Sequence, residues 1–380
     1  MSAEQERLAR VRLSHALEPG DGKVTDAVAT IGATRTLDEL LADPQSRPEL
    51  AARLGEADAD RLLSLAERQG IRFVTPADTE WPTQLGDLAH GQRVQGLGGV
   101  PVGLWVRGPM RLDELKASVA IVGSRSATSY GFDVATDVAA ALARAGAPVV
   151  SGAAFGIDQA GHRGALAAGG ATVAVLACGV DRAYPAAHRE LIDHIAHHFA
   201  VVSEAPLGSS PTKVRFLSRN RLIAALSRGT VLIEAATRSG ALNTAHWADQ
   251  LSRVLMGVPG PVTSATSQGV HNQIRLGAAS LVTSGLEVLE LVGVSGEHLM
   301  AVPRGPERPH DGFSLREVRV LDAVPVARGA STESIGRIAG VGIQEADRVL
   351  VALGRAGLVH LADDGWRLFA GGGGGGASRT

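Results

Sequence analysis

The sequence predicts an α/β protein. Its centre is a parallel sheet covered by helices on both faces, with a small helical domain before it and a winged-helix-like domain after it. Between residues 101 and 294, short runs rich in β-branched residues alternate with Gly/Ser loops and helical stretches, as in βαβ units. Residues 313–369 contain three helical stretches followed by a hairpin signal. The chain has 380 residues, 45% of them hydrophobic, which is enough for two or three packed domains.

The first 75 residues predict a small helical domain, of the SAM or helix-hairpin-helix kind. Apolar residues recur at helical spacing over residues 4–17 and 36–41. A third stretch, 57–69, ends at Gly70, a typical residue after the last turn of a helix. Residues 76–100 are rich in Pro and Gly and predict a connection to the sheet.

Eight apolar runs in residues 101–294 are expected to form the strands. They are residues 104–106, 119–122, 148–150, 172–176, 201–202, 230–233, 254–258 and 281–282. Helical segments lie between them, near 132–144, 158–168, 187–197, 217–227, 241–252, 270–277 and 285–292. A sheet of this kind binds ligands at the carboxyl ends of its strands, where the Gly/Ser loops are.

The rest of the chain predicts a linker, a small domain and a tail. Residues 295–312 contain three prolines and no periodicity, as in a linker. Helices are expected near 315–323, 332–339 and 344–355, before two apolar runs joined by Asp364-Gly365, a hairpin signal. Three helices and a hairpin form a winged-helix architecture. Residues 370–380, with six consecutive glycines, are expected to be disordered.

Charge and composition exclude several classes of protein. There are 37 basic and 39 acidic residues, so any nucleic-acid site must come from local clustering of charge. No apolar run reaches the roughly 18 residues of a membrane span, and the charged N-terminus lacks a signal-peptide core. The single cysteine, Cys178, cannot form an internal disulfide. A cytoplasmic protein with no membrane partner is therefore expected.

The loops lack the fingerprints of common cofactor sites. The loop at residues 123–131 is not G-x-G-x-x-G, and the next strand, ending at Ser151, lacks the acid that binds a ribose hydroxyl. There is no P-loop, no G-x-S-x-G elbow and no loop cysteine that could act as a nucleophile. No cofactor, no bound metal and no enzymatic activity are expected.

Three loops instead combine backbone N–H groups, hydroxyls and guanidinium groups before predicted helices. They are Gly123-Ser124-Arg125, residues 151–158 with Gly152, and residues 237–241 with Ser239 and Gly240. Helix N-termini bind anions, although Gly and Ser also simply make tight turns. Three such loops on one sheet edge favour a phosphate ligand.

The strongest local signal is a run of positive charge. Residues 205–233 contain five cations and no acid. The cations are Lys213, Arg215, Arg219, Arg221 and Arg228, and Phe216 and Asn220 lie among them. Cations that hold phosphates beside an aromatic ring that stacks on a base are typical of single-stranded nucleic-acid sites. A solvated arginine-rich helix face, with Phe216 only packing, is the alternative.

These motifs together resemble the DNA-processing protein DprA (Smf) family. The matching segments are VGSR at 122–125, SGAAFGID at 151–158, GVDRAYP at 179–185, SEAP at 203–206, FLSRNRLIA at 216–224, and EA at 234–235 with SGAL at 239–242. The resemblance implies an extended Rossmann fold without known catalysis. It also implies a homodimer that binds single-stranded DNA and delivers it to the RecA recombinase during natural transformation. Leu217 and Ser252 depart from the usual pattern.

The predicted nucleic-acid-binding residues combine the loops, the cationic run and the resemblance. They are Gly123, Ser124, Arg125, Gly152, Lys213, Phe216, Arg219, Asn220, Arg221, Ser239 and Gly240. The resemblance assigns DNA contacts to Arg125, Lys213 and Phe216 in particular. The first two lie 88 positions apart, but both follow strands that end at the same sheet edge, so one site is expected.

Three other interpretations remain open. A nucleoside-monophosphate phosphoribohydrolase of the lysine-decarboxylase-like type has a similar sheet, but the loop after Glu234 lacks its glycine run, which favours a structural Glu234. His194, His197 and His198, with His188 nearby, have helical spacing but too few further ligands for a metal. A transcription factor would read DNA with residues 344–348, which carry two acids. The winged-helix-like domain is therefore assigned to protein contact or regulation.

Overall fold

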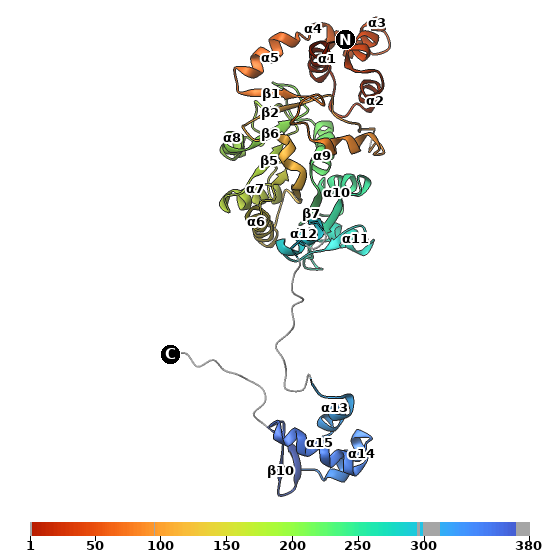
Figure 1. The fold of residues 1–380 in the computed structure, drawn as a ribbon, viewed down its shortest axis with the longest axis vertical. Helices are drawn as coiled ribbons and strands as arrows, with labels where there is room; N and C mark the ends of the chain where they lie inside the picture. Colours follow the sequence, from red (N-terminus) through yellow and green to blue (C-terminus); the bar gives the residue numbers. More distant parts are fainter. Residues whose placement is uncertain (1, 95, 295–296, 299–311, 370–380) are drawn as a thin grey trace. The chain divides into compact units, whose positions relative to one another are not determined.

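The computed structural model describes residues 2–94, 96–294, 297–298 and 312–369. The described residues form two compact units, one before residue 300 and one at residues 312–369 (Figure 1). The predicted linker at 295–312 and the predicted tail at 370–380 lie almost entirely outside the described residues. No helix of the described parts is long and apolar enough to span a membrane.

Five helices precede the sheet. They are α1 (Ala3–Ala16), α2 (Gly22–Ile31), α3 (Ala33–Ala42), α4 (Pro48–Glu56) and α5 (Ala59–Glu67). Ser2 and Gln5 form a capping box that begins α1, which satisfies backbone N–H groups that have no partner inside the helix. Helix α1 also packs on the sheet, because the buried Trp105 indole donates a 3.0 Å hydrogen bond to the Ser14 hydroxyl.

Nine strands form one mixed sheet. They are β1 (Ile71–Val74), β2 (Leu104–Arg107), β3 (Val119–Val122), β4 (Val149–Ser151), β5 (Thr172–Val175), β6 (Ala200–Ser203), β7 (Gly229–Leu232), β8 (Val254–Gly257) and β9 (Ser280–Leu281). The spatial order is β1-β2-β6-β5-β4-β3-β7-β8-β9. The predicted parallel sheet is confirmed for β3 to β9, whereas β1 and β2 run antiparallel to their neighbours.

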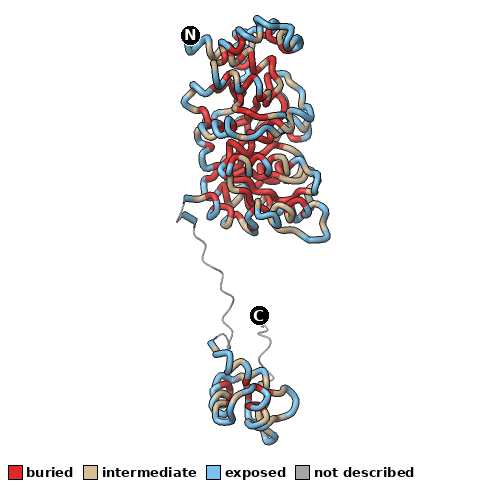
Figure 2. The backbone as a smooth tube through the Cα atoms, turned by 90° about the vertical axis from the view of Figure 1, so that its right-hand side faces the viewer, coloured by how far each residue is buried: buried red, intermediate tan, exposed pale blue. Residues whose placement is uncertain are grey.

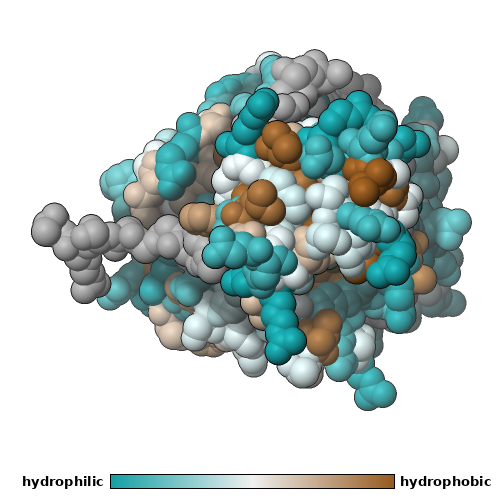
Figure 3. Space-filling model, turned by 90° about the horizontal axis from the view of Figure 1, so that it is seen from below, coloured by the Kyte–Doolittle hydropathy of each residue, from teal (hydrophilic) through white to brown (hydrophobic). Residues whose placement is uncertain are grey.

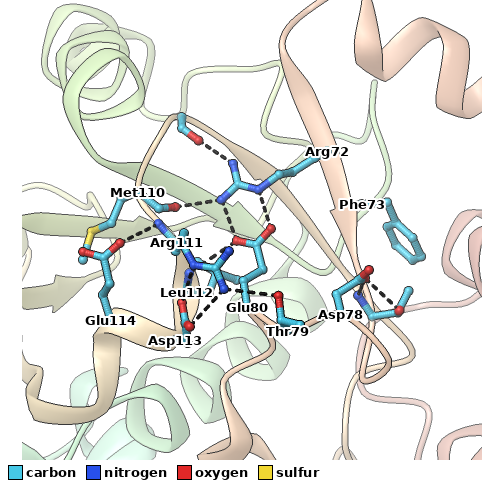
Figure 4. A network of polar contacts seen from close by, with 12 residues as sticks. Arg72, Phe73, Asp78, Thr79, Glu80, Met110, Arg111, Leu112, Asp113 and Glu114 are labelled. Carbon is cyan, nitrogen blue, oxygen red and sulfur yellow. Dashed lines mark hydrogen bonds and ion pairs between the residues drawn. The ribbon is translucent and has the colours of Figure 1, made fainter.

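Strand β1 was not predicted and lies inside the range assigned to the helical domain. Its four residues are too few for a periodic signal, and tertiary contacts hold it instead. The Phe73 ring lies 4.6 Å from the Trp105 ring. Arg72 forms two 2.8 Å hydrogen bonds to Glu80 and one of 2.7 Å to the Met110 carbonyl (Figure 4). These contacts join the strand to the connection that follows it.

The helices cover both faces of the sheet, and each face has its own apolar core. Buried residues fill the interior of the first unit (Figure 2). One face carries α9 (Lys213–Leu226), α10 (Ala241–Gln250), α11 (Gln268–Arg275) and the 3-10 helices η1 (Thr83–Ala89) and η2 (Leu112–Ala117). The other carries α6 (Ser129–Arg144), α7 (Ile157–Ala167) and α12 (Gly285–Val292). Helix α8 (Arg189–His198) and η3 (Ala186–His188) follow β5.

The strand order reverses beside β3. From β3 the chain proceeds through β4 and β5 to β6 in one direction, and through β7 and β8 to β9 in the other. In open α/β sheets, ligands bind outside the carboxyl ends of the strands at this point. The loops after β3 and β7 therefore flank the expected site.

The second unit has three helices and a two-stranded antiparallel hairpin. It contains α13 (Leu315–Asp322), α14 (Thr332–Ala339), α15 (Ile343–Arg355), β10 (Val359–Ala362) and β11 (Gly365–Leu368). Its core includes the fully buried Ile335 and Leu350. Gly340 ends α14 with a φ of +69°, a conformation that favours glycine. On the face seen in Figure 3, hydrophobic side chains lie in small separate groups among hydrophilic ones.

Candidate nucleic-acid interface

A cavity of about 670 Å³ opens at the strand reversal. Three segments form most of its wall: the loop after β3 at residues 123–126, the start of α9 with the residues before it at 211–220, and the loop before α10 at 236–241. Val122, Ala154, Asp158, Ile223 and Thr244 complete the wall. Nine of the eleven predicted binding residues lie on its wall. They are Gly123, Ser124, Arg125, Lys213, Phe216, Arg219, Asn220, Ser239 and Gly240.

The loop after β3 is held by backbone contacts that only glycine allows. A Cβ on Gly123 would lie 2.5 Å from the Ile157 side chain. The Ser124 N–H donates to the Glu234 carbonyl at 2.6 Å, and the Ser124 carbonyl accepts from the Ile157 N–H at 3.2 Å. These bonds fix the backbone that carries Arg125.

Arg125 stacks on Phe216. The guanidinium carbon of Arg125 lies 4.7 Å from the centre of the Phe216 ring, well within the range of a cation–π contact. Lys213 is the first residue of α9, and Thr212 caps that helix by accepting the Arg215 N–H. Arg125 and Lys213 both line the cavity, although 88 positions separate them in the sequence.

Arg219 forms an almost wholly buried part of the cavity wall. It is 6% exposed, and its Nη1 donates to the Val175 carbonyl at 2.8 Å. Its buried Nε has no hydrogen-bond partner among the described residues. A Cβ on Gly152 would lie 1.6 Å from Nη1. Gly152 thus does not line the cavity, but its missing side chain leaves room for Arg219.

Asp158 is a buried acid whose negative charge acts on Arg219. It is 7% exposed and accepts the Ala154 N–H at 3.3 Å. Burial raises the pKa of Asp158, although the positive charge of Arg219 acts in the opposite direction. Burial also lowers the pKa of Arg219, which the negative charge of Asp158 partly offsets. The two groups therefore depend on each other for compensation inside a region with little solvent.

Arg221 does not belong to the interface, which corrects its assignment from the sequence. Its side chain is fully buried and forms two hydrogen bonds, of 2.7 and 2.8 Å, with the Glu204 carboxylate. Its Nε donates to the Gly99 carbonyl at 3.2 Å. Both charges of the pair are thus satisfied within the fold, and Arg221 has a structural role.

Fewer cations of residues 205–233 are available to a ligand than the sequence indicates, because some form ion pairs within the protein. Arg215 makes two 2.9 Å hydrogen bonds with Glu18, which lies between α1 and α2. Glu18 and Glu204 lie outside the 29-residue acid-free window, so the window overstated the positive charge. Arg238, in the loop at residues 237–241 but not among the predicted binding residues, is a further cation that lines the cavity.

Other candidate groups have structural partners. Glu234 is 2% exposed, and its oxygens accept from the Thr128 N–H at 2.9 Å, the Thr128 hydroxyl at 2.7 Å and the Thr266 hydroxyl at 3.1 Å. This confirms its predicted structural role. His188 contacts the Ala153 carbonyl at 2.9 Å. Within the described ranges, no group of three or more His, Cys, Asp or Glu side chains could hold a metal.

Comparison with known proteins decides the family. The model of the family described as DNA recombination-mediator protein A matches residues 72–293. The chain belongs to this family, that of the DNA-processing protein DprA. A putative DNA-processing protein DprA of Mycobacterium tuberculosis is 43% identical over 378 residues, covering 97% of this chain and 95% of the relative.

Two solved structures of the family are also similar. DprA from Streptococcus pneumoniae has 31% sequence identity and a TM-score of 0.63, covering 76% of this chain and 98% of that one. DprA from Helicobacter pylori has 27% identity and a TM-score of 0.51, covering 58% and 94%. The latter structure was described for its single-stranded DNA binding mode.

Proposed function

We propose that this protein binds single-stranded DNA in the cavity at the strand reversal. The observation that carries the proposal is the charge of the cavity wall. Arg125, Lys213, Arg219 and Arg238 line it, against one acid, the buried Asp158. The whole chain is slightly acidic, so this local excess of cations is a focused attraction for an anion.

The side chains suit a phosphate backbone with accessible bases. Arg125 offers a planar fork that can bind two phosphate oxygens, and its stacking on Phe216 restricts its orientation. Lys213 supplies a mobile point charge. The cavity volume is that of a site for a small ligand, so one or two nucleotides can enter it while a paired stack cannot.

Delivery of the bound strand to the RecA recombinase is the second part of the proposal. It rests on the family, whose model is described as a recombination-mediator protein. The proposal gives the protein the role of a carrier rather than an enzyme, because Asp158 on the cavity wall and Glu234 after β7 are both buried. Glu234 accepts three hydrogen bonds, and Asp158 is 7% exposed.

We further propose that the chain forms a homodimer through the last part of the sheet. Leu276, Leu281 and Leu286 are 69%, 53% and 54% exposed. They lie just after α11, on the edge strand β9 and on α12. Exposed leucines next to an unpaired strand edge are typical of an interface between copies.

A mobility-shift titration tests the proposed DNA binding. The wild-type protein should bind a single-stranded oligonucleotide more tightly than its duplex, with a log–log salt slope near −2 to −3 for about three or four neutralised phosphates. Arg125→Ala and Lys213→Ala should each weaken binding and flatten the slope by about 0.7. Arg348→Ala, in the second unit, is the matched control and should change neither.

Two results would contradict this assignment. Equal affinity for a blunt duplex would remove the single-strand preference. Loss of binding in Arg348→Ala but not in Lys213→Ala would move the site to the second unit. That unit has seven basic and seven acidic residues in its described range, 312–369, so no net attraction for a polyanion is expected there.

A further inference from the structure

We propose that Tyr184 is a second base-stacking position, so that a bound strand continues from the cavity across the loop at residues 179–185. This inference rests on the proposed single-stranded DNA binding. It assigns a role to Arg182 and Tyr184, the exposed residues of the segment GVDRAYP, whereas Val180 of the same segment lies in an apolar core cluster.

The aromatic geometry beside the cavity supports this path. The Arg125 guanidinium stacks on the Phe216 ring, with its central carbon 4.7 Å from the ring centre. The Tyr184 ring lies 5.7 Å from the Phe216 ring, tilted by 55°. Tyr184 is 43% exposed and does not line the cavity. It therefore offers an open ring surface directly outside the wall that Phe216 forms.

The loop that carries Tyr184 is fixed to the loop between β6 and α9. The Gly179 N–H donates to the Ser209 carbonyl at 3.1 Å. The two Asp181 carboxylate oxygens accept the Gly208 N–H at 3.0 and 2.9 Å. A Cβ on Gly179 would lie 2.7 Å from the Pro206 carbonyl oxygen. The two loops form one body, so little ordering is needed when a base stacks on Tyr184.

A cation accompanies the exposed ring. Arg182 is exposed, and its Nη1 lies 3.4 Å from the Ser210 hydroxyl oxygen. No carboxylate of the described residues forms an ion pair with it. A basic side chain two positions from an open aromatic ring can bind a phosphate of the nucleotide whose base stacks there, the combination that single-strand sites use.

Oligonucleotide length separates this position from the cavity. Oligothymidylates of two nucleotides, which the cavity alone can hold, and of twelve nucleotides are titrated with the full chain, wild-type and variant, by fluorescence anisotropy. Tyr184→Ala should weaken binding of the twelve-nucleotide strand roughly 5- to 150-fold, the range for loss of one stacked base. It should leave binding of the two-nucleotide strand unchanged, because that strand ends within the cavity, and it should leave the salt slope unchanged, because no charge is removed. Tyr184→Phe should bind both strands as the wild type does.

Two further variants exclude a packing effect and a general effect of exposed tyrosines. Tyr184→Leu keeps an apolar contact with Phe216 but removes the π-surface, so it should behave as Tyr184→Ala does. The matched control is Tyr130→Ala at the only other tyrosine. Tyr130 is 42% exposed, but its hydroxyl donates to the Pro259 carbonyl at 2.5 Å. Its loss should not affect either strand.

The outcomes distinguish this inference from the proposed function. If neither strand binds to the wild type, the proposed function itself fails. If Lys213→Ala weakens binding but Tyr184→Ala binds both strands like the wild type, only the inference fails. Equal losses on both strands in Tyr184→Ala would overturn it too, because they would mean that Tyr184 supports the cavity instead of extending the path.

Discussion

The buried ion pair of Arg221 and Glu204 allows a test of whether Arg221 stabilises the fold or binds DNA. The Arg221 side chain is 0% exposed and that of Glu204 7%. The guanidinium also donates to the Ser218 carbonyl at 3.0 Å and to the Gly99 carbonyl at 3.2 Å. In Arg221→Met, the Glu204 carboxylate stays buried and loses its cation.

The expected loss of stability in Arg221→Met follows from this unpaired buried carboxylate. Leaving one charge of a buried pair uncompensated costs about 3–5 kcal/mol of stability. At about 2–4 °C per kcal/mol for a large domain, the melting temperature of the first unit should fall by roughly 6–20 °C. The double variant Arg221→Met with Glu204→Leu buries no charge and should recover most of this loss, because apolar replacements of a whole buried pair are often neutral or stabilising.

Calorimetry and DNA titration of the same samples check the prediction. Melting temperatures come from differential scanning calorimetry, and single-strand affinity is measured well below them. The double variant should melt near the wild type and bind DNA with wild-type affinity. A wild-type melting temperature in Arg221→Met, together with weaker DNA binding, would refute the reasoning and return Arg221 to the interface.

Three further variants probe the ion pair of Arg215, the space around Arg219 and the buried His162. Glu18→Ala frees Arg215 and should steepen the single-strand salt slope by up to about 0.7, measured by anisotropy at several salt concentrations; an unchanged slope would mean that Arg215 is out of reach. Gly152→Ala puts a methyl group on the Arg219 guanidinium and should weaken DNA binding about 10- to 100-fold, as expected for loss of a charged hydrogen bond; unchanged affinity in the same titration would contradict this. Burial lowers the pKa of His162 from 6.5 to about 3. As pH falls through that window, denaturant titrations should therefore show the wild type losing up to about 1.4 kcal/mol per pH unit more than His162→Gln, and parallel curves would refute it.

The low pKa of His162 has a local cause besides burial. The Thr172 hydroxyl donates to the Val149 carbonyl at 2.9 Å, so it accepts from His162 Nδ1 at 2.7 Å. The proton of neutral His162 is thus on Nδ1. Nε2 is buried without a partner among the described residues, and a second proton there would be unsatisfied. Stability is therefore present above pH 6.5 and lost as the pH falls toward 3.

The strands were predictable because parallel strands buried on both faces are continuous apolar runs. The predicted runs 119–122 and 230–233 coincide with β3 and β7 to within one residue. Helices α2 and α4 were not predicted, because short helices at the surface of a small domain depend on packing more than on their own periodicity. Strand β1 was missed for the same reason.

The sequence could predict those parts of the candidate site that follow from strand order. It could not predict which arginines form ion pairs with carboxylates from other parts of the chain. Arg125 and Lys213 could be paired across 88 residues because loops after parallel strands share an edge. The roles of Arg215 and Arg221 depend on Glu18 and Glu204, whose proximity no local window contains. Such carboxylates reduce a dense cationic run to a few cations that face solvent.

The N-terminal helices are packed against the part of the first unit that contains the cavity. An apolar cluster and an ion pair join them to it. Val11 and Ala59 lie in one apolar cluster with Trp105 of β2. Glu18 holds Arg215, which also donates to the Ser210 carbonyl at 2.8 Å, in the loop that leads to Lys213. Removing these helices would expose that cluster and release the loop. The helical domain therefore helps to position the start of α9, although none of its residues lines the cavity.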